Sequence, residues 1–184
     1  MTGTRRPSSW DLTAARDKTI PDVAGSGLRV LFAGINPGLY SAATGYHFAR
    51  PGNRFWPALH RSGFTPLLLR PAEQGELRAL GLGITNMVAR ATARAGELTD
   101  DEVRAGGVRL RELTLGVRPR WLAVVGITAY RVAFDAPRAA VGPQQATIGD
   151  ARVWLLPNPS GLNAHWQLPE LAAEFARLRA AAVA

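Results

Sequence analysis

The sequence has no cysteine, and its only histidines, His47, His60 and His165, lie far apart in the chain. Without thiols the protein forms no disulfide, no thiolate zinc site and no thiol nucleophile. The spacing of the histidines fits no common set of metal ligands, so we expect neither a metal nor another cofactor.

Long apolar runs are also missing. No stretch reaches the length of a membrane span, and no apolar segment follows the arginines near the start as it would in a signal peptide. We therefore expect a cytoplasmic protein with no membrane partner.

Lys18 is the only lysine, whereas the sequence has 21 arginines, and the formal net charge is +8. A positive charge favours a polyanionic partner because each phosphate that is neutralised releases counterions. The same excess of arginine and alanine can equally reflect the base composition of the genome. Both interpretations stay open on charge alone.

The length of 184 residues, 47% of them apolar, is enough for one domain with a buried core. Short apolar runs that end at glycine, such as 28–34 and 120–126, are typical of buried parallel strands. Thr99 and Glu102 have the spacing of a capping box at a helix start. The patterns predict strands at 28–34, 84–88, 120–126 and 151–161, the last running into a turn, and helices at 53–64 (with Asn53 as N-cap), 71–83, 99–117, 127–134 and 169–184.

Strands that alternate with helices predict an α/β protein, a three-layer α/β/α domain with a short, mostly parallel central sheet covered on both faces. We expect this domain to span residues 28–184. Residues 1–27 are polar and contain Gly, Ser and Pro, so we expect them to form a loosely ordered lead-in.

Two of the expected strands end in an Asn-Pro turn, "GINPG" at 34–38 and "PNPSG" at 157–161. In a parallel sheet both turns reach the carboxyl edge, where such folds bind ligands. Proline fixes φ and glycine permits close backbone approach, so each turn can hold a side chain rigidly. Asn-Pro is common in turns, but two copies at matching strand ends favour a functional site.

Neither turn has the pattern of a nucleotide-binding loop. "GINPGLYS" lacks the spacing and the lysine of a P-loop, and no GxGxxG or GxSxG pattern occurs. Ser160 in the second turn leaves a serine hydrolase as a weak alternative, because no histidine stands at a spacing that identifies it as the partner.

The segments "GINPGLYSAATGYHFARPGNRFW" (34–56) and "LPNPSGLNAH" (156–165) resemble those of the mismatch-specific uracil-DNA and thymine-DNA glycosylases, relatives of the broader uracil-DNA glycosylases. "GITNMVARAT" (83–92) and "RAGG" (104–107) fit the same resemblance. It implies a monomeric, monofunctional DNA glycosylase that works at the bacterial nucleoid. Such an enzyme flips uracil, preferably opposite guanine, out of double-stranded DNA and hydrolyses its glycosidic bond.

The resemblance also implies roles for residues of the first turn. Asn36 would position the attacking water; an amide orients water but cannot remove its proton as a carboxylate would. Phe48 would stack on the flipped base. Ile35, Tyr40 and Ser41 would shape the base pocket, with Tyr46 as a further wall.

In the second turn, Asn158 would face the base pocket. Gly161, Leu162 and Asn163 would enter the helix, Leu162 as a wedge that replaces part of the lost stacking. Further pocket or phosphate contacts would come from Asn86, Ala93, Arg94, Ser160 and His165. No carboxylate stands near Ala93, so water activation would rest on the amide.

Two other functions stay open. One is a mismatch-binding module of the same fold with little or no catalysis, and the other is an α/β hydrolase of small nucleosides. Release of uracil from a G·U duplex separates the enzyme from the binding module. Activity on free deoxyuridine identifies the nucleoside hydrolase.

Overall fold

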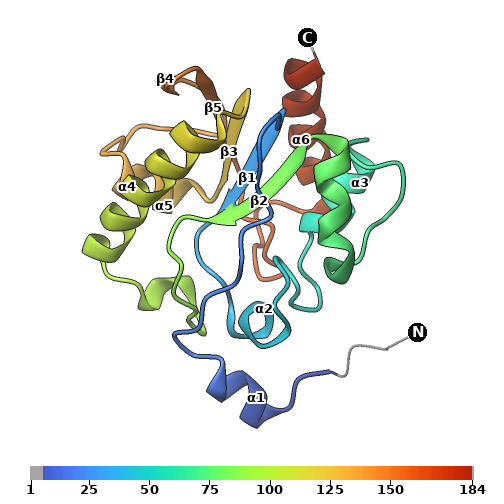
Figure 1. Cartoon of the computed structure of the whole chain (residues 1–184), viewed down its shortest axis with the longest axis vertical. Helices are drawn as coiled ribbons and strands as arrows, with labels where there is room; N and C mark the ends of the chain where they lie inside the picture. The colour runs from blue at the N-terminus through green and yellow to red at the C-terminus, as the bar shows by residue number, and fades with distance from the viewer. Residues whose placement is uncertain (1–5, 184) are drawn as a thin grey trace.

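The computed structural model describes residues 6–183 and contains a five-stranded sheet in the order β2-β1-β3-β5-β4 (Figure 1). Four strands are parallel, and β4 pairs antiparallel with β5 at one edge. The expected α/β fold with a mostly parallel sheet is therefore confirmed. The strands are β1 (Val30–Gly34), β2 (Leu82–Asn86), β3 (Trp121–Val125), β4 (Gly142–Ile148) and β5 (Ala151–Leu156).

Helices cover both faces of the sheet. Consecutive side chains of β1 point to opposite faces, and since they are apolar, both faces must be buried. Val30 and Phe32 pack in the cluster that includes α3 and α6, whereas Leu31 and Ala33 pack in the cluster that includes α4 and α5. Figure 1 shows these two pairs of helices on opposite sides of the strands. The helices are α1 (Ser9–Ala14), α2 (Leu39–Thr44), α3 (Phe55–Arg61), α4 (Asp100–Val117), α5 (Ile127–Ala133) and α6 (Leu168–Val183), with 3-10 helices η1 (Pro71–Leu80) and η2 (Ala95–Glu97).

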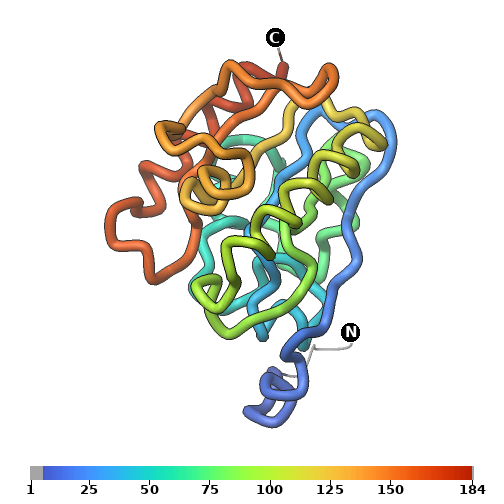
Figure 2. Tube along the Cα trace, turned by 90° about the vertical axis from the view of Figure 1, so that its left-hand side faces the viewer, coloured from blue at the N-terminus to red at the C-terminus, as the bar shows by residue number. Residues whose placement is uncertain are grey.

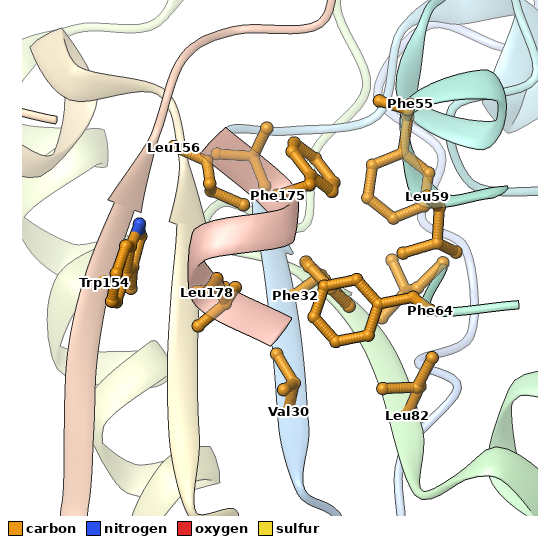
Figure 3. Packing of buried hydrophobic residues seen from close by; sticks show 14 of the residues in the cluster. Val30, Phe32, Phe55, Leu59, Phe64, Leu82, Trp154, Leu156, Phe175 and Leu178 are labelled. Carbon is orange, nitrogen blue, oxygen red and sulfur yellow. The ribbon is translucent and has the colours of Figure 1, made fainter. Parts of the chain in front are cut away.

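An aromatic cluster holds α3 and α6 against β1 (Figure 3). The ring of Phe32 meets Phe55 and Phe64 edge to face, with centroids 5.5 and 5.4 Å away, and stacks on Phe175 at 5.8 Å. Such pairs each add about 0.5–1.5 kcal/mol beyond simple burial. The core thus fixes the carboxyl end of β1, from which the first Asn-Pro turn emerges.

Several elements differ from the sequence predictions. The segment 71–83 contains the 3-10 helix η1, which ends at Leu80 because the next residue, Gly81, has a φ of 67°. β2 then begins at Leu82 rather than at residue 84. Arg54, not Asn53, is the N-cap of α3, although Asn53 Oδ1 accepts from the Phe55 N–H at 2.9 Å. α1, α2 and the edge strand β4 were not predicted.

The part of the lead-in that the structure describes, expected from the sequence to be loosely ordered, contains the helix α1 and a contact with β2. α1 begins with a capping box between Ser8 and Asp11. Val23 and Ile84 exchange two backbone hydrogen bonds of 2.8 Å, which attach the lead-in to β2. A Cβ on Gly83 would lie 2.6 Å from the Val23 carbonyl oxygen, so this approach requires glycine there. Within residues 6–183, no helix is long and apolar enough to cross a membrane.

Candidate active site

The carboxyl ends of the four parallel strands surround a cavity of about 380 Å³. Asn36 follows β1, Asn86 ends β2, Val125 ends β3 and Asn158 follows β5, and all four line it. The two Asn-Pro turns, far apart in sequence, therefore meet at one site. The strand order reverses at β1, which is where open parallel sheets bind ligands.

Hydrogen bonds fix the side-chain amide of Asn36 at this cavity. Its Nδ2 donates to the Arg90 carbonyl oxygen at 2.9 Å and to Thr92 Oγ1 at 2.8 Å. Both amide hydrogens are used in this way, which leaves Oδ1 as the free acceptor. Within residues 6–183, no donor reaches Oδ1 of Asn36, so it is available to a water or a ligand.

The partners of Asn36 are themselves held. Thr92 is 1% exposed, and its hydroxyl donates to the Arg94 carbonyl oxygen at 2.8 Å. The guanidinium of Arg90 pairs with Glu102 and with Asp17, both at 2.8 Å. These hydrogen bonds to carboxylates raise the pKa of Arg90. The segment 90–94 is thereby a firm support for the Asn36 amide.

Phe48 forms an aromatic wall of the cavity. Its ring stacks on Phe55 with centroids 4.1 Å apart and planes at 15°, so one face is covered. Its φ of 51° lies in the left-handed region, which non-glycine residues rarely adopt. Strain of this kind is kept where surrounding structure requires one side-chain position. Phe48 is therefore a rigid platform beside the cavity.

Asn86 lies next to Phe48, over Gly34. A Cβ built on Gly34 would lie 2.8 Å from Asn86 Oδ1 and 3.1 Å from Phe48 Cζ. Any larger residue at position 34 would push these two side chains away, so the glycine is required at this strand end. The amide and the ring thus form adjoining parts of one wall.

His47 is bonded to Asn86 and to the N-terminal segment. Its Nε2 lies 2.9 Å from the Pro21 carbonyl oxygen, and its Nδ1 lies 3.2 Å from Asn86 Nδ2. The side chain is 1% exposed, and burial lowers the pKa of His47, although the Pro21 carbonyl and nearby Asp22 oppose that shift. His47 is therefore held in its neutral form at neutral pH.

The charged groups on the cavity wall are cations. Arg50 and Arg94 line it, and the described part of the lining contains no aspartate or glutamate. Neither arginine is in an ion pair within residues 6–183. Such a site favours anionic groups and lacks a carboxylate base.

The second turn continues into a loop, residues 158–166. Arg54, the N-cap of α3, holds this loop by hydrogen bonds. Arg54 Nη1 donates to the carbonyl oxygens of Asn163 at 3.0 Å and Trp166 at 2.7 Å, and Nη2 donates to that of Gly161 at 3.1 Å. Figure 2 shows this orange-red loop projecting from the body of the molecule. Leu162, at its tip, is 78% exposed.

The loop 158–166 and the segment 50–53 lie so close together that a smaller cavity of about 220 Å³ forms between them. A Cβ on Gly161 would lie 2.6 Å from the Gly52 carbonyl oxygen, so glycine is needed at this contact. Arg50, Asn53, Ser160 and Leu162 line both cavities, which are therefore adjacent.

Comparison with known families identifies the fold and the chain's relatives. The model of the uracil DNA glycosylase superfamily matches residues 21–181. The chain belongs to the uracil-DNA glycosylase superfamily. A solution structure from Methanosarcina acetivorans, provisionally described as a uracil DNA glycosylase, matches with a TM-score of 0.56 at 19% identity, covering 89% of this chain and 98% of that one. At that identity the likeness concerns the fold alone.

Membership of this superfamily supports a uracil-glycosylase role, and most of the residues expected at the site do meet there. Asn36 and Phe48 line the cavity together with Ile35, Ser41, Asn86, Ala93, Arg94, Asn158, Ser160 and Leu162. Among the residues described, Tyr40, Tyr46, Gly161, Asn163 and His165 are not on its wall. Gly161 instead lines the smaller cavity, and His165 is exposed on the loop.

Sequence reasoning missed His47, Arg50, Asn53 and Ile20 as lining residues. Asn53 was considered only as a helix cap and His47 only as a metal ligand. The position of His47 immediately before Phe48, inside the long motif, was the one signal that pointed to it.

Proposed function

We propose that the protein is a monofunctional DNA glycosylase that flips uracil out of double-stranded DNA, preferably opposite guanine, and hydrolyses its glycosidic bond. The observation that carries this proposal is the fixed amide of Asn36, which presents a free Oδ1 to the same cavity as Phe48. Superfamily membership supports the reaction class.

In the proposed reaction the flipped uracil stacks on the open face of Phe48. Stacking of a base on an aromatic ring contributes about 1–3 kcal/mol and offsets part of the cost of flipping. Leu162, exposed at the loop tip, fills the gap in the helix. Ser41 and Asn158 complete the cavity wall around the base.

The bond between C1′ and N1 breaks as uracil departs with its electron pair, and the sugar becomes oxocarbenium-like. Asn36 Oδ1 accepts a hydrogen bond from a water whose oxygen then bonds to C1′. The water's proton passes to solvent or to the departed base. Arg50 and Arg94 favour the anionic base and the flanking phosphates electrostatically.

An amide orients water without removing its proton, so we expect slow turnover that relies on stabilising the leaving group. Strand cleavage by a Schiff base would need an amine. The single lysine, Lys18, is exposed and is not on the described cavity wall. These features support a monofunctional enzyme. We further propose that it acts as a monomer.

A labelled G·U duplex tests the proposal. We expect uracil release, seen as strand cleavage only after alkali opens the abasic site, and slower release from an A·U duplex. The lack of a carboxylate on the described cavity wall favours a second candidate, a mismatch-binding protein without catalysis. Tight binding of the G·U duplex with no alkali-labile product would establish that candidate instead.

A further inference from the structure

The hydrogen bonds of His47 determine its tautomer. The Pro21 carbonyl oxygen, 2.9 Å from Nε2, can only accept, so Nε2 carries the hydrogen. In a neutral imidazole the other nitrogen then has a lone pair and can only accept. The Asn86 atom 3.2 Å from Nδ1 must therefore be the amide nitrogen. With a neutral His47, these two contacts fix which way the Asn86 amide faces.

The acceptor that directs this arrangement is itself anchored. Asp22, the next residue, accepts from Thr85 Oγ1 at 2.6 Å and pairs with Arg109 at 2.9 Å. The same arginine donates to the Asn86 carbonyl oxygen at 2.6 Å. Main chain and side chain of Asn86 are therefore held by one network, which starts in the N-terminal segment.

The fixed amide has a defined hydrogen-bond pattern toward the cavity. Oδ1 of Asn86 lies over Gly34 beside the Phe48 ring, and no donor within residues 6–183 reaches it. One hydrogen of Nδ2 is used by His47, and the second remains. The wall beside the platform thus offers one acceptor and one donor side by side.

We propose that His47 is a positioning residue that locks this amide and so restricts the cavity to bases with an imide edge. This inference rests on the proposed function and deepens it. Uracil and thymine present N3–H as a donor to Oδ1 and O4 as an acceptor to Nδ2. Cytosine presents the opposite pattern, a lone pair at N3 and an amino group at C4, which this amide orientation repels.

Excision of uracil and of cytosine tests the lock. His47→Phe keeps a ring of similar size but removes the acceptor, so the Asn86 amide becomes free to turn. We expect single-turnover release of uracil from a G·U duplex to fall about tenfold, the effect of one buried hydrogen bond. The rate ratio of uracil to cytosine, the latter placed opposite adenine, should fall by at least as much. His60→Phe, which replaces a partly buried histidine bonded to Thr65, should leave the ratio unchanged.

A merely structural role would slow both substrates equally, and an unchanged ratio in His47→Phe overturns the inference. Nitrogen NMR of the histidine-labelled wild type gives an independent reading, aided by the small number of histidines, three. We expect a protonated Nε2 and an unprotonated Nδ1 at His47; a protonated Nδ1 overturns the lock, even if the variant fails to fold. If the wild type releases no base, the proposed function and the base selection are both overturned. The NMR measurement still tests independently whether His47 holds the Asn86 amide.

Discussion

The hydroxyl of Thr92 accepts a hydrogen bond from Asn36 Nδ2 at 2.8 Å, at the carboxyl edge of the sheet. It joins the end of β1 to a segment more than fifty residues later and makes a rotatable amide into a fixed acceptor. In our account the chemical step depends on this orientation, since no carboxylate is on the described cavity wall to replace it.

Thr92→Val keeps the shape of the side chain and removes its hydroxyl. The Asn36 amide then keeps one anchor, the Arg90 carbonyl. We expect the single-turnover rate on G·U duplex to fall about tenfold, with duplex affinity unchanged. Thr114→Val is the matched control, because Thr114 is fully buried but bonds only within α4. Equal rates for the two variants would exclude a role for Thr92 in orienting Asn36.

Leu162→Ala tests the wedge. Because single-stranded DNA has no gap to fill, we expect activity on duplex to fall about tenfold and activity on single-stranded uracil DNA to change little. A tenfold loss corresponds to about 1.4 kcal/mol, which is part of the stacking energy that the wedge restores. The control is Leu115→Ala, which changes an exposed leucine on α4, away from the loop; it should affect activity on neither substrate. Equal losses on both substrates at Leu162 would contradict the wedge.

Arg54→Met removes the three hydrogen bonds to the loop that carries Leu162. The loop then samples other conformations, so we expect a loss on duplex like that of Leu162→Ala and a double variant no worse than either single one. The control is Arg61→Met, which changes an exposed arginine at the other end of α3. Additive losses in the double variant would show that Arg54 acts by another route, such as direct phosphate binding.

The buried His47 should make stability depend on pH. Its folded pKa is lowered by burial from the usual 6.5, so below that pH the unfolded chain takes up the proton first. Stability is therefore fully present above pH 6.5 and falls as pH drops toward the lowered pKa. Urea unfolding across this range should show a steeper loss for wild type than for His47→Gln, with exposed His165→Gln behaving as wild type. Parallel curves for wild type and His47→Gln would contradict this.

Local patterns in the sequence predicted some of the elements, although α1 was missed despite the capping box of Ser8 and Asp11. The apolar run before Gly34 and the capping box at Thr99 gave β1 and α4 nearly to the residue. α2 was missed because its six residues have no side-chain cap. β4 was missed because "GPQQATI" is polar and contains proline, so its pairing with β5 depends on the fold around it.

The candidate site was likewise predictable only in part. Two Asn-Pro turns at strand ends predicted that Asn36 and Asn158 would meet, because parallel strands bring their carboxyl ends to one edge. The partners of His47 and of Arg54 could not be predicted, since they are carbonyl oxygens and an amide 26 to 112 residues away. Carbonyl groups belong to every residue and leave no sequence signal.

The central claim is that Asn36 orients the water that attacks the sugar. Its most direct test is the single-turnover rate of uracil release from a G·U duplex by wild type and by Asn36→Ala, with duplex binding measured in parallel. We predict a loss of at least about 100-fold in the Asn36→Ala rate, with binding retained. An Asn36→Ala rate equal to that of wild type would contradict the account.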